Sequence, residues 1–174
     1  LQDAQQLDYQ EEFDMIFSLT TLQWVQSHEA FLAGAYQGLK HGGLLAITMP
    51  MGLPSTLEQA VDEVAASPKW SSYFQQFSTG WNFVEDEFYA KLIAAQGFEA
   101  TRLVVVPQKD IFPSREVFQK FINQWFPYLR PLPQDLKQDF LNQVIDRFLE
   151  LESPFPNGEI HFKIRRLEVV AMKP

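Results

Sequence analysis

The chain has 174 residues, which is enough for one domain with a hydrophobic core of its own. Its composition, 46% hydrophobic and 21% charged, excludes disordered, collagen-like and coiled-coil classes, and the lack of cysteine excludes disulfide frameworks and thiolate metal sites. The net charge of −8 argues against nucleic acid as a general partner. No apolar run reaches the roughly 20 residues of a membrane span, and no secretory signal pattern opens the chain, so we expect a cytoplasmic protein.

The first third of the chain predicts a strand, a helix and a strand. A short apolar run at 13–18 indicates a buried strand. Apolar residues within 31–39 recur at helical spacing, and we expect Ser27 to cap this helix and Gly42-Gly43 to end it. A second buried strand at 44–49 follows. This order and spacing indicate a crossover between parallel neighbours, as in an α/β domain.

The middle of the chain continues the alternation of helices and strands. We expect helices at 54–66 and 86–96, the second ended by Gly97, and a strand at 102–106. The aromatic segment 70–81 has no clear period and receives no assignment.

A long helical insertion is predicted at 113–152. Its second half carries a wide apolar stripe that includes Phe140 and Phe148. We expect the insertion to fold over the strand ends as a cap, with this stripe packed against the aromatic residues of 70–88. Three prolines interrupt the insertion: Pro127, Pro131 and Pro133.

The last predicted strand, 160–172, changes phase in its middle. Its apolar residues lie on even positions before Arg165-Arg166 and on odd positions after them. One extra residue there would restore a common core face, so we expect a β-bulge at the two arginines.

Several motifs carry a resemblance to a known family. Four segments resemble the second half of class I S-adenosylmethionine-dependent methyltransferases: Asp3-Ala4, 13–18 (FDMIFS), 22–25 (LQWV) and 39–45 (LKHGGLL). Four more are similar to the trans-aconitate and juvenile hormone acid methyltransferase groups of that family: 112–114 (FPS), 129–133 (LRPLP), Phe140-Leu141 and 165–171 (RRLEVVA).

The resemblance implies both a fold and an activity. The fold is a Rossmann-like α/β sheet with a helical cap inserted before the last strand. We expect 1–174 to be a partial domain, with the sheet core in 1–112 and 153–174 and the cap in 113–152. The family's glycine-rich turn and its ribose-binding acid are not found in the chain, so we expect a fragment rather than a degenerate relative. The implied activity is methyl transfer from S-adenosylmethionine to the carboxylate of a small acid.

The resemblance also assigns five residues to the cofactor. It places Asp3 and Ala4 at the adenine, and Ser18, Leu19 and Thr20 beside the sulfonium, where open α/β sheets hold their ligands. The alternatives are a frayed terminus for the first pair and an ordinary polar turn for the other three residues.

The acceptor acid has five further candidate residues. Gln23 and Trp24 can donate hydrogen bonds to a carboxylate, and Arg130, Arg165 and Arg166 can pair with one. Alternatively, Trp24 is a core residue and the arginines pair with local acids on the surface.

We expect no dedicated catalytic residue and no metal site. A carboxylate is already ionised at neutral pH, so orientation can supply most of the rate. His28, His41 and His161 lack metal-ligand spacing and are interpreted as surface or turn residues. An alternative function is a non-catalytic module whose aromatic pocket binds an apolar ligand or a protein. Self-association through the strand 13–18 is also expected.

Overall fold

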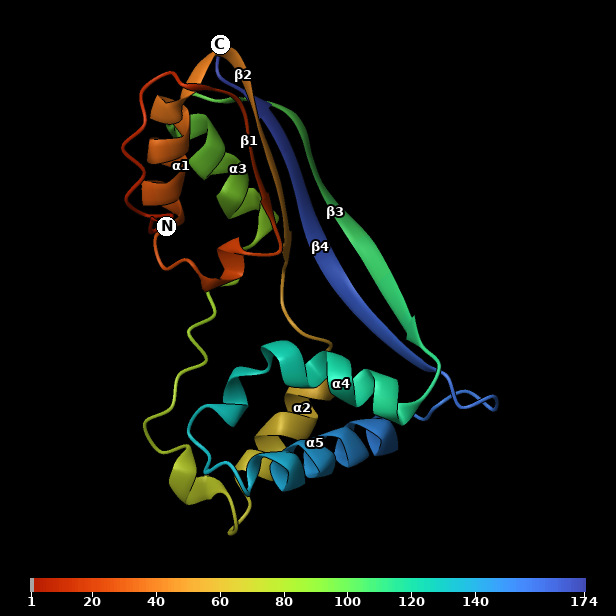
Figure 1. Ribbon diagram of the computed structural model, residues 1–174. Helices are drawn as coiled ribbons and strands as arrows, with labels where there is room; N and C mark the ends of the chain where they lie inside the picture. The colour runs from red at the N-terminus through yellow and green to blue at the C-terminus, as the bar shows by residue number, and fades with distance from the viewer. Residues whose placement is uncertain (1) are drawn as a thin grey trace. The chain divides into compact units, whose positions relative to one another are not determined.

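The chain crosses between two structural units several times. In the computed structural model, which describes residues 2–174, one unit comprises residues 2–52, Gly80–Gln108 and Ile164–Pro174. The other comprises Leu53–Thr79 and Lys109–Lys163. The first, the sheet unit, holds β1, α1 and α3, and the second, the helical unit, holds α2, α4 and α5 (Figure 1).

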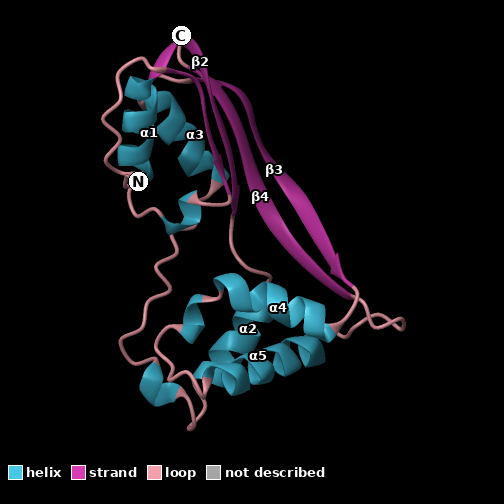
Figure 2. Ribbon diagram, in the orientation of Figure 1, coloured by secondary structure: helices cyan, strands magenta, loops and turns pink. Residues whose placement is uncertain are grey.

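The strands form a mixed sheet. In the described part of the chain it has four strands in the order β1-β2-β4-β3 (Figure 2). β1 (Phe13–Leu19) is parallel to β2 (Leu39–Pro50), as predicted, and β2 is antiparallel to β4 (Ile160–Met172). β3 (Glu99–Phe112) is longer than the strand predicted at 102–106. The predicted α/β fold class is confirmed.

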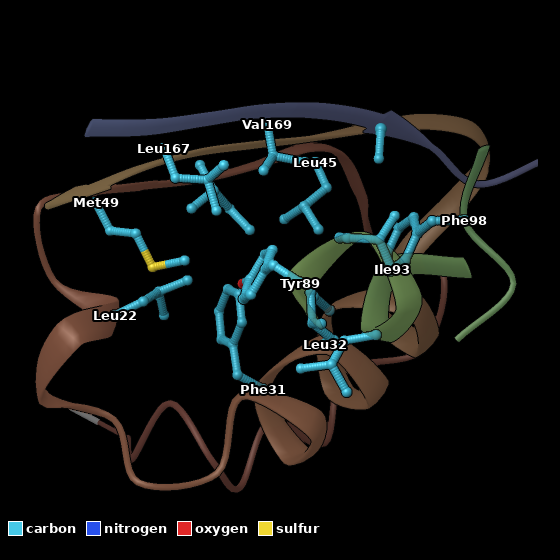
Figure 3. Close-up of a cluster of buried hydrophobic side chains, with 14 of the residues drawn as sticks. Leu22, Phe31, Leu32, Leu45, Met49, Tyr89, Ile93, Phe98, Leu167 and Val169 are labelled. Carbon is cyan, nitrogen blue, oxygen red and sulfur yellow. The ribbon is translucent and has the colours of Figure 1, made fainter. Parts of the chain in front are cut away.

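Two helices supply the apolar layer beneath the sheet. In Figure 3, Leu45, Leu167 and Val169 point from the strands toward Phe31 of α1 and Tyr89 of α3, and all of these side chains are buried. α1 (His28–Gly38) and α3 (Asp86–Ala95) present this face because their apolar residues recur at helical spacing.

The start of α1 agrees with the prediction, and its end does not. Ser27 caps the helix as expected, because the backbone N–H of Ala30 donates to Ser27 Oγ at 3.1 Å. The expected end at Gly42-Gly43 was wrong, since α1 ends at Gly38 and β2 begins at Leu39.

Gly42 and Gly43 instead form an irregularity within β2. While β1 advances from Phe13 to Met15, β2 advances from Leu39 to Leu44. The extra residues include Gly42 with φ of +77°, a left-handed conformation that glycine adopts at little cost. Lys173 closes this bulge from the other side, with its N–H donating to the Gly43 carbonyl at 3.0 Å.

The phase change in β4 does not produce one common face. The pairing of β4 with β2 is regular from Arg166 to Met172, so no bulge brings all the apolar residues to one side there. Leu167 and Val169 enter the core of the sheet unit, whereas Phe162 contacts the Phe118 and Phe121 rings of the helical unit. The alternation changes because β4 contributes to two cores.

The helical unit is built on aromatic packing. It contains α2 (Ser55–Ala65), α4 (Arg115–Trp125) and α5 (Lys137–Leu151), with short 3-10 turns at Ser71–Tyr73 and Pro127–Leu129. The predicted contact of α5 with the aromatic segment is confirmed at Phe140, whose ring lies 5.3 Å from Trp70 and 5.1 Å from Phe74. Phe148 stacks on Phe118 instead, at 5.4 Å.

Candidate functional site

The candidate site lies at one edge of the sheet unit. Thr48 of β2 pairs with Leu19 of β1 on one side and with Glu168 of β4 on the other. Beyond these pairs, the Met51 N–H donates to the Arg165 carbonyl at 3.0 Å. The carboxyl ends of the two parallel strands and Arg165 therefore share the edge at which open α/β sheets bind ligands.

The backbone turns sharply as it leaves β1. Thr20 has φ of +53°, which is unusual for a residue with a side chain, and its N–H donates to the Thr48 carbonyl at 2.7 Å. Ser18 is half-buried, and Leu19 and Thr20 are exposed. These three residues present backbone and side-chain groups next to the turn.

The residues that follow, 20–28, are called the Trp24 loop below. Gln23 is buried, and its Nε2 donates to the Thr20 carbonyl at 3.1 Å. The carboxamide thus supports the turn, while its Oε1 has no hydrogen-bond partner among the described residues. Gln23 was assigned to the acceptor, and the structure gives its amino group a role in holding the loop.

His28 closes the loop from within the core. It is 3% exposed, and its Nε2 lies 2.9 Å from the Leu22 carbonyl, so this nitrogen carries the proton and donates. Burial lowers the pKa of His28, and the ring meets Tyr89 edge to face at 5.5 Å. The interpretation of His28 as a surface residue was therefore wrong, because its ring is buried against Tyr89.

Trp24 lies at the end of a short 3-10 turn (Leu22–Trp24) and is half-buried. Its indole faces that of Trp81, with ring centroids 5.7 Å apart and an interplanar angle of 49°. An indole pair at a strand end can cover the apolar part of a small ligand.

Asp3 and Ala4 are tethered to this loop through Gln5. The Gln5 side-chain oxygen accepts the Ser27 N–H at 2.8 Å, and the Gln5 N–H donates to Asp3 Oδ1 at 2.9 Å. Asp3 is exposed, and Ala4 packs against the core of the sheet unit. The two candidate adenine residues are therefore connected to the Trp24 loop.

The three candidate arginines are separated. Arg165 is exposed at the sheet edge, with Glu85 as a distant partner at 3.7 Å. Arg130 belongs to the helical unit, where its Nη1 donates to the Thr79 carbonyl at 3.2 Å. Only Arg165 is brought to the same sheet edge as the turn after β1.

Arg166 takes part in a different network. It donates to Glu168 at 2.7 Å and to Gln108 at 3.0 Å, and Arg102 donates to the same carboxylate at 2.8 Å. Hydrogen bonds from Arg102 and then Arg166 hold the pKa of the Glu168 carboxyl below its ordinary range. Both Arg166 and Glu168 alternate with the core residue Leu167, so they lie on the opposite face of the sheet.

Two residues of this site escaped the sequence analysis, Trp81 and Asn82. The Asn82 N–H donates to the Gln23 carbonyl at 2.8 Å, and its Nδ2 donates to the carbonyls of Val25 and Gln26. Trp81 lies in the segment 70–81 and Asn82 follows it, and no hydrophobic periodicity allowed an assignment there.

Within the described residues, no helix is long and apolar enough to cross a membrane, and no group of three or more potential metal ligands is found.

Comparisons with known proteins agree with this architecture. The family described as "Methyltransferase domain" matches residues 1–47. A trans-aconitate 2-methyltransferase of Acidovorax sp. (strain JS42) is 27% identical over 165 residues, which cover 92% of this chain and 63% of that protein. Its counterpart in Rhizobium etli is 23% identical over 171 residues, covering 94% of this chain and 64% of that protein. In sequence and in fold, the chain is similar to class I methyltransferases.

Solved structures show that the methyltransferase fold extends over the whole chain. A protein of Bacillus halodurans C-125, described as a putative methyltransferase, matches 99% of this chain and 70% of its own, with a TM-score of 0.57 and 16% identity. The [4+2]-cyclase SpnF matches 99% of this chain and 54% of its own, with a TM-score of 0.51 and 16% identity. At this identity the similarity shows the fold alone, and the chain spans 63% of the length of the Acidovorax relative.

Proposed function

We propose that this methyltransferase transfers a methyl group from S-adenosylmethionine to a carboxylate oxygen of a small acid. The observation that carries the proposal is the gathering of the Thr20 turn, the Trp24–Trp81 pair and Arg165 at one edge of the sheet unit. The similarity to trans-aconitate 2-methyltransferases over 92% of the chain supports the choice of a carboxylate.

The residues present fit one side of the cofactor. Asp3 is exposed and uses only Oδ1 in the contacts to Gln5, so Oδ2 can accept the adenine amino group. Ser18, Leu19 and Thr20 border the position expected for the sulfonium, which supplies an activated methyl group when the cofactor is bound. The 174 residues contain no glycine-rich turn between a strand and a helix, so the fit covers the adenine and sulfonium only.

The acceptor is oriented by charge and by aromatic surface. The Arg165 guanidinium attracts the carboxylate, the Trp24 indole N–H donates to one of its oxygens, and the Trp24–Trp81 pair covers the apolar part of the acid. With the cofactor bound, the other oxygen would form the new bond to the methyl carbon, and the electron pair of the broken carbon–sulfur bond would stay on sulfur. No proton transfer is needed, because the acceptor is ionised. Arg130 and Arg166 are not required by this arrangement.

The test is a comparison of acceptors with the whole protein. A free tricarboxylic or dicarboxylic acid should gain one methyl group, measured by mass spectrometry, while its amide and its methyl ester should not gain one at that position. Turnover of the amide at a similar rate would contradict the carboxylate assignment. Turnover with none of them would favour the second candidate.

The second candidate is a non-catalytic module that binds an apolar ligand or a protein partner. A depression of about 600 Å³ in the helical unit favours it, with the rings of Phe74, Phe77 and Tyr128 in its wall. Titration with an apolar fluorescent probe, with Phe77→Ser as the control, tests whether this depression binds ligands without methyl transfer.

A further inference from the structure

One short segment holds the Trp24 loop from outside. Across the segment Gly80–Asn82, four hydrogen bonds reach the residues on both sides of Trp24. The Asn82 N–H donates to the Gln23 carbonyl at 2.8 Å, and Asn82 Nδ2 donates to the carbonyls of Val25 at 3.1 Å and Gln26 at 2.9 Å. In return, Gln26 Nε2 donates to the Gly80 carbonyl at 2.8 Å.

These contacts fix both indoles at once. Trp24 lies between two residues whose carbonyls Asn82 binds, and Trp81 is the residue immediately before Asn82. The two rings therefore meet at 5.7 Å, with the backbone segments that carry them joined by the same residue, Asn82. Phe83 extends the aromatic surface, with its ring 5.4 Å from Trp81.

Among side chains with the shape of asparagine, only an amide can make the hydrogen bonds found at position 82. Asn82 uses the amino group of its carboxamide toward two carbonyl oxygens, and one planar group supplies both donors. An aspartate of equal size would present an oxygen to those carbonyls, and lone pairs would then face lone pairs. Leucine would leave both carbonyls without the donors they have now.

We propose that Asn82 is a positioning residue that sets the geometry of the Trp24–Trp81 pair, and that Trp81 with Trp24 forms the wall that holds the apolar part of the acceptor. This inference rests on the proposed methyl transfer. It adds a specificity-determining contact, Trp81, and an anchor more than fifty residues along the chain from the loop that it holds.

The test uses the whole protein with the substitution Asn82→Asp. The indole pair should lose its coupled near-ultraviolet circular dichroism while the far-ultraviolet spectrum is unchanged. The KM for the acid acceptor should rise about tenfold, with cofactor affinity within about threefold. The matched control is Asn157→Asp in the helical unit, where Oδ1 accepts the Glu159 N–H and aspartate keeps that bond. It should leave both the spectrum and the KM unchanged.

A second variant covers the case in which Asn82→Asp does not fold. Gln26→Glu removes only the bond to the Gly80 carbonyl and should change the near-ultraviolet signal in the same direction, less strongly. Trp81→Phe should raise the acceptor KM without lowering the melting temperature as far as Asn82→Asp does.

The outcomes separate this inference from the proposed function. An unchanged indole signal and an unchanged KM in folded Asn82→Asp or Gln26→Glu overturn the positioning role. If the unsubstituted protein methylates no acid, the proposed function fails, and the indole signal alone then decides whether Asn82 sets the geometry of the pair.

Discussion

Single side chains decide the course of the backbone where it leaves β1. Gln23, His28 and Asn82 each donate to a carbonyl of the Trp24 loop, and Thr20 at the start of the loop has a positive φ. Because these donors come from the core side and from a distant segment, the loop is fixed independently of any ligand. Such a loop can present Trp24 in one orientation to an acceptor.

Trp24 provides the first test at the residue level. In the whole protein, Trp24→Phe should lower methyl transfer to the acid, because phenylalanine keeps an aromatic face and loses the indole N–H. Cofactor affinity should stay within about threefold. Steady-state kinetics measures the rate of methyl transfer, and cofactor titration measures the cofactor affinity. An equal loss of methyl transfer and of cofactor affinity would make Trp24 a structural residue.

His28 predicts a pH dependence of stability. Burial holds its pKa below the ordinary 6.5 in the folded state, whereas the unfolded chain titrates near that value. The neutral ring therefore stabilises the fold above about pH 6.5, and this contribution is lost as the pH falls toward the folded pKa. His28→Gln can still donate to the Leu22 carbonyl and does not titrate.

The measurement is urea denaturation of both proteins between about pH 7.5 and pH 5. The free-energy difference between wild type and His28→Gln should narrow as the pH falls. Parallel curves over this range would show that His28 does not contribute to the pH dependence.

At the level of elements, features set by neighbouring residues could be predicted from the sequence. Features set by contacts between residues far apart in the chain could not. Ser27 and Gly97 mark helix ends by their own chemistry, so they could be read from the sequence. The early start of β2 could not, because residues 40–43 are held in the strand by Lys173, far along the chain. Asn82 was missed for the same reason: its partners are more than fifty residues away.

The site follows the same division. The strand end at Ser18 and the indole of Trp24 were predicted from a local motif, and the structure brings the strand end to the same sheet edge as Arg165. The pairing of Arg166 with Glu168 depends on the phase of β4, which the sequence alone did not resolve.

Helix α5 provides a prediction about packing. Phe140 is fully buried between Trp70 and Phe74, so Phe140→Ala should lower the free energy of unfolding by about 3 to 5 kcal/mol. Phe155 is 47% exposed in the same unit, and Phe155→Ala should cost within about 0.5 kcal/mol. Chemical denaturation measures both. Similar costs for the two substitutions would mean that α5 is not packed on the aromatic segment.

At the scale of the whole molecule, β1 is one of the two edge strands of the sheet in the described part of the chain. Met15 is 53% exposed, Phe17 66% and Leu19 60%, on a strand with β2 on one side only. Two copies of β1 paired antiparallel about Ile16 would set Met15 opposite Phe17 and would bring no two acids together. Such an apolar edge invites pairing.

The 174-residue chain by itself should therefore associate with a second copy. Light scattering should give a mass above that of a monomer, and Phe17→Lys should reduce it, because a charge at the edge opposes pairing. A monomer at all concentrations would show that β1 is not a pairing edge.

Cofactor binding by the same chain should be weak, since the glycine-rich turn and the ribose-binding acid of the family are not among its residues. Titration calorimetry with S-adenosylmethionine measures this. Micromolar affinity for a monomer would mean that other residues of the chain hold the ribose and methionine parts.

The two-core role of β4 also has a consequence for synthesis of the protein. On the ribosome, β2 is made long before β4, the strand that lies between β2 and β3. Until β4 emerges, one side of β2 stays open, and both hydrophobic clusters lack buried side chains such as Phe162 and Val169. The nascent chain therefore reaches its final structure only late in translation, and its unpaired strand edges are exposed during that interval.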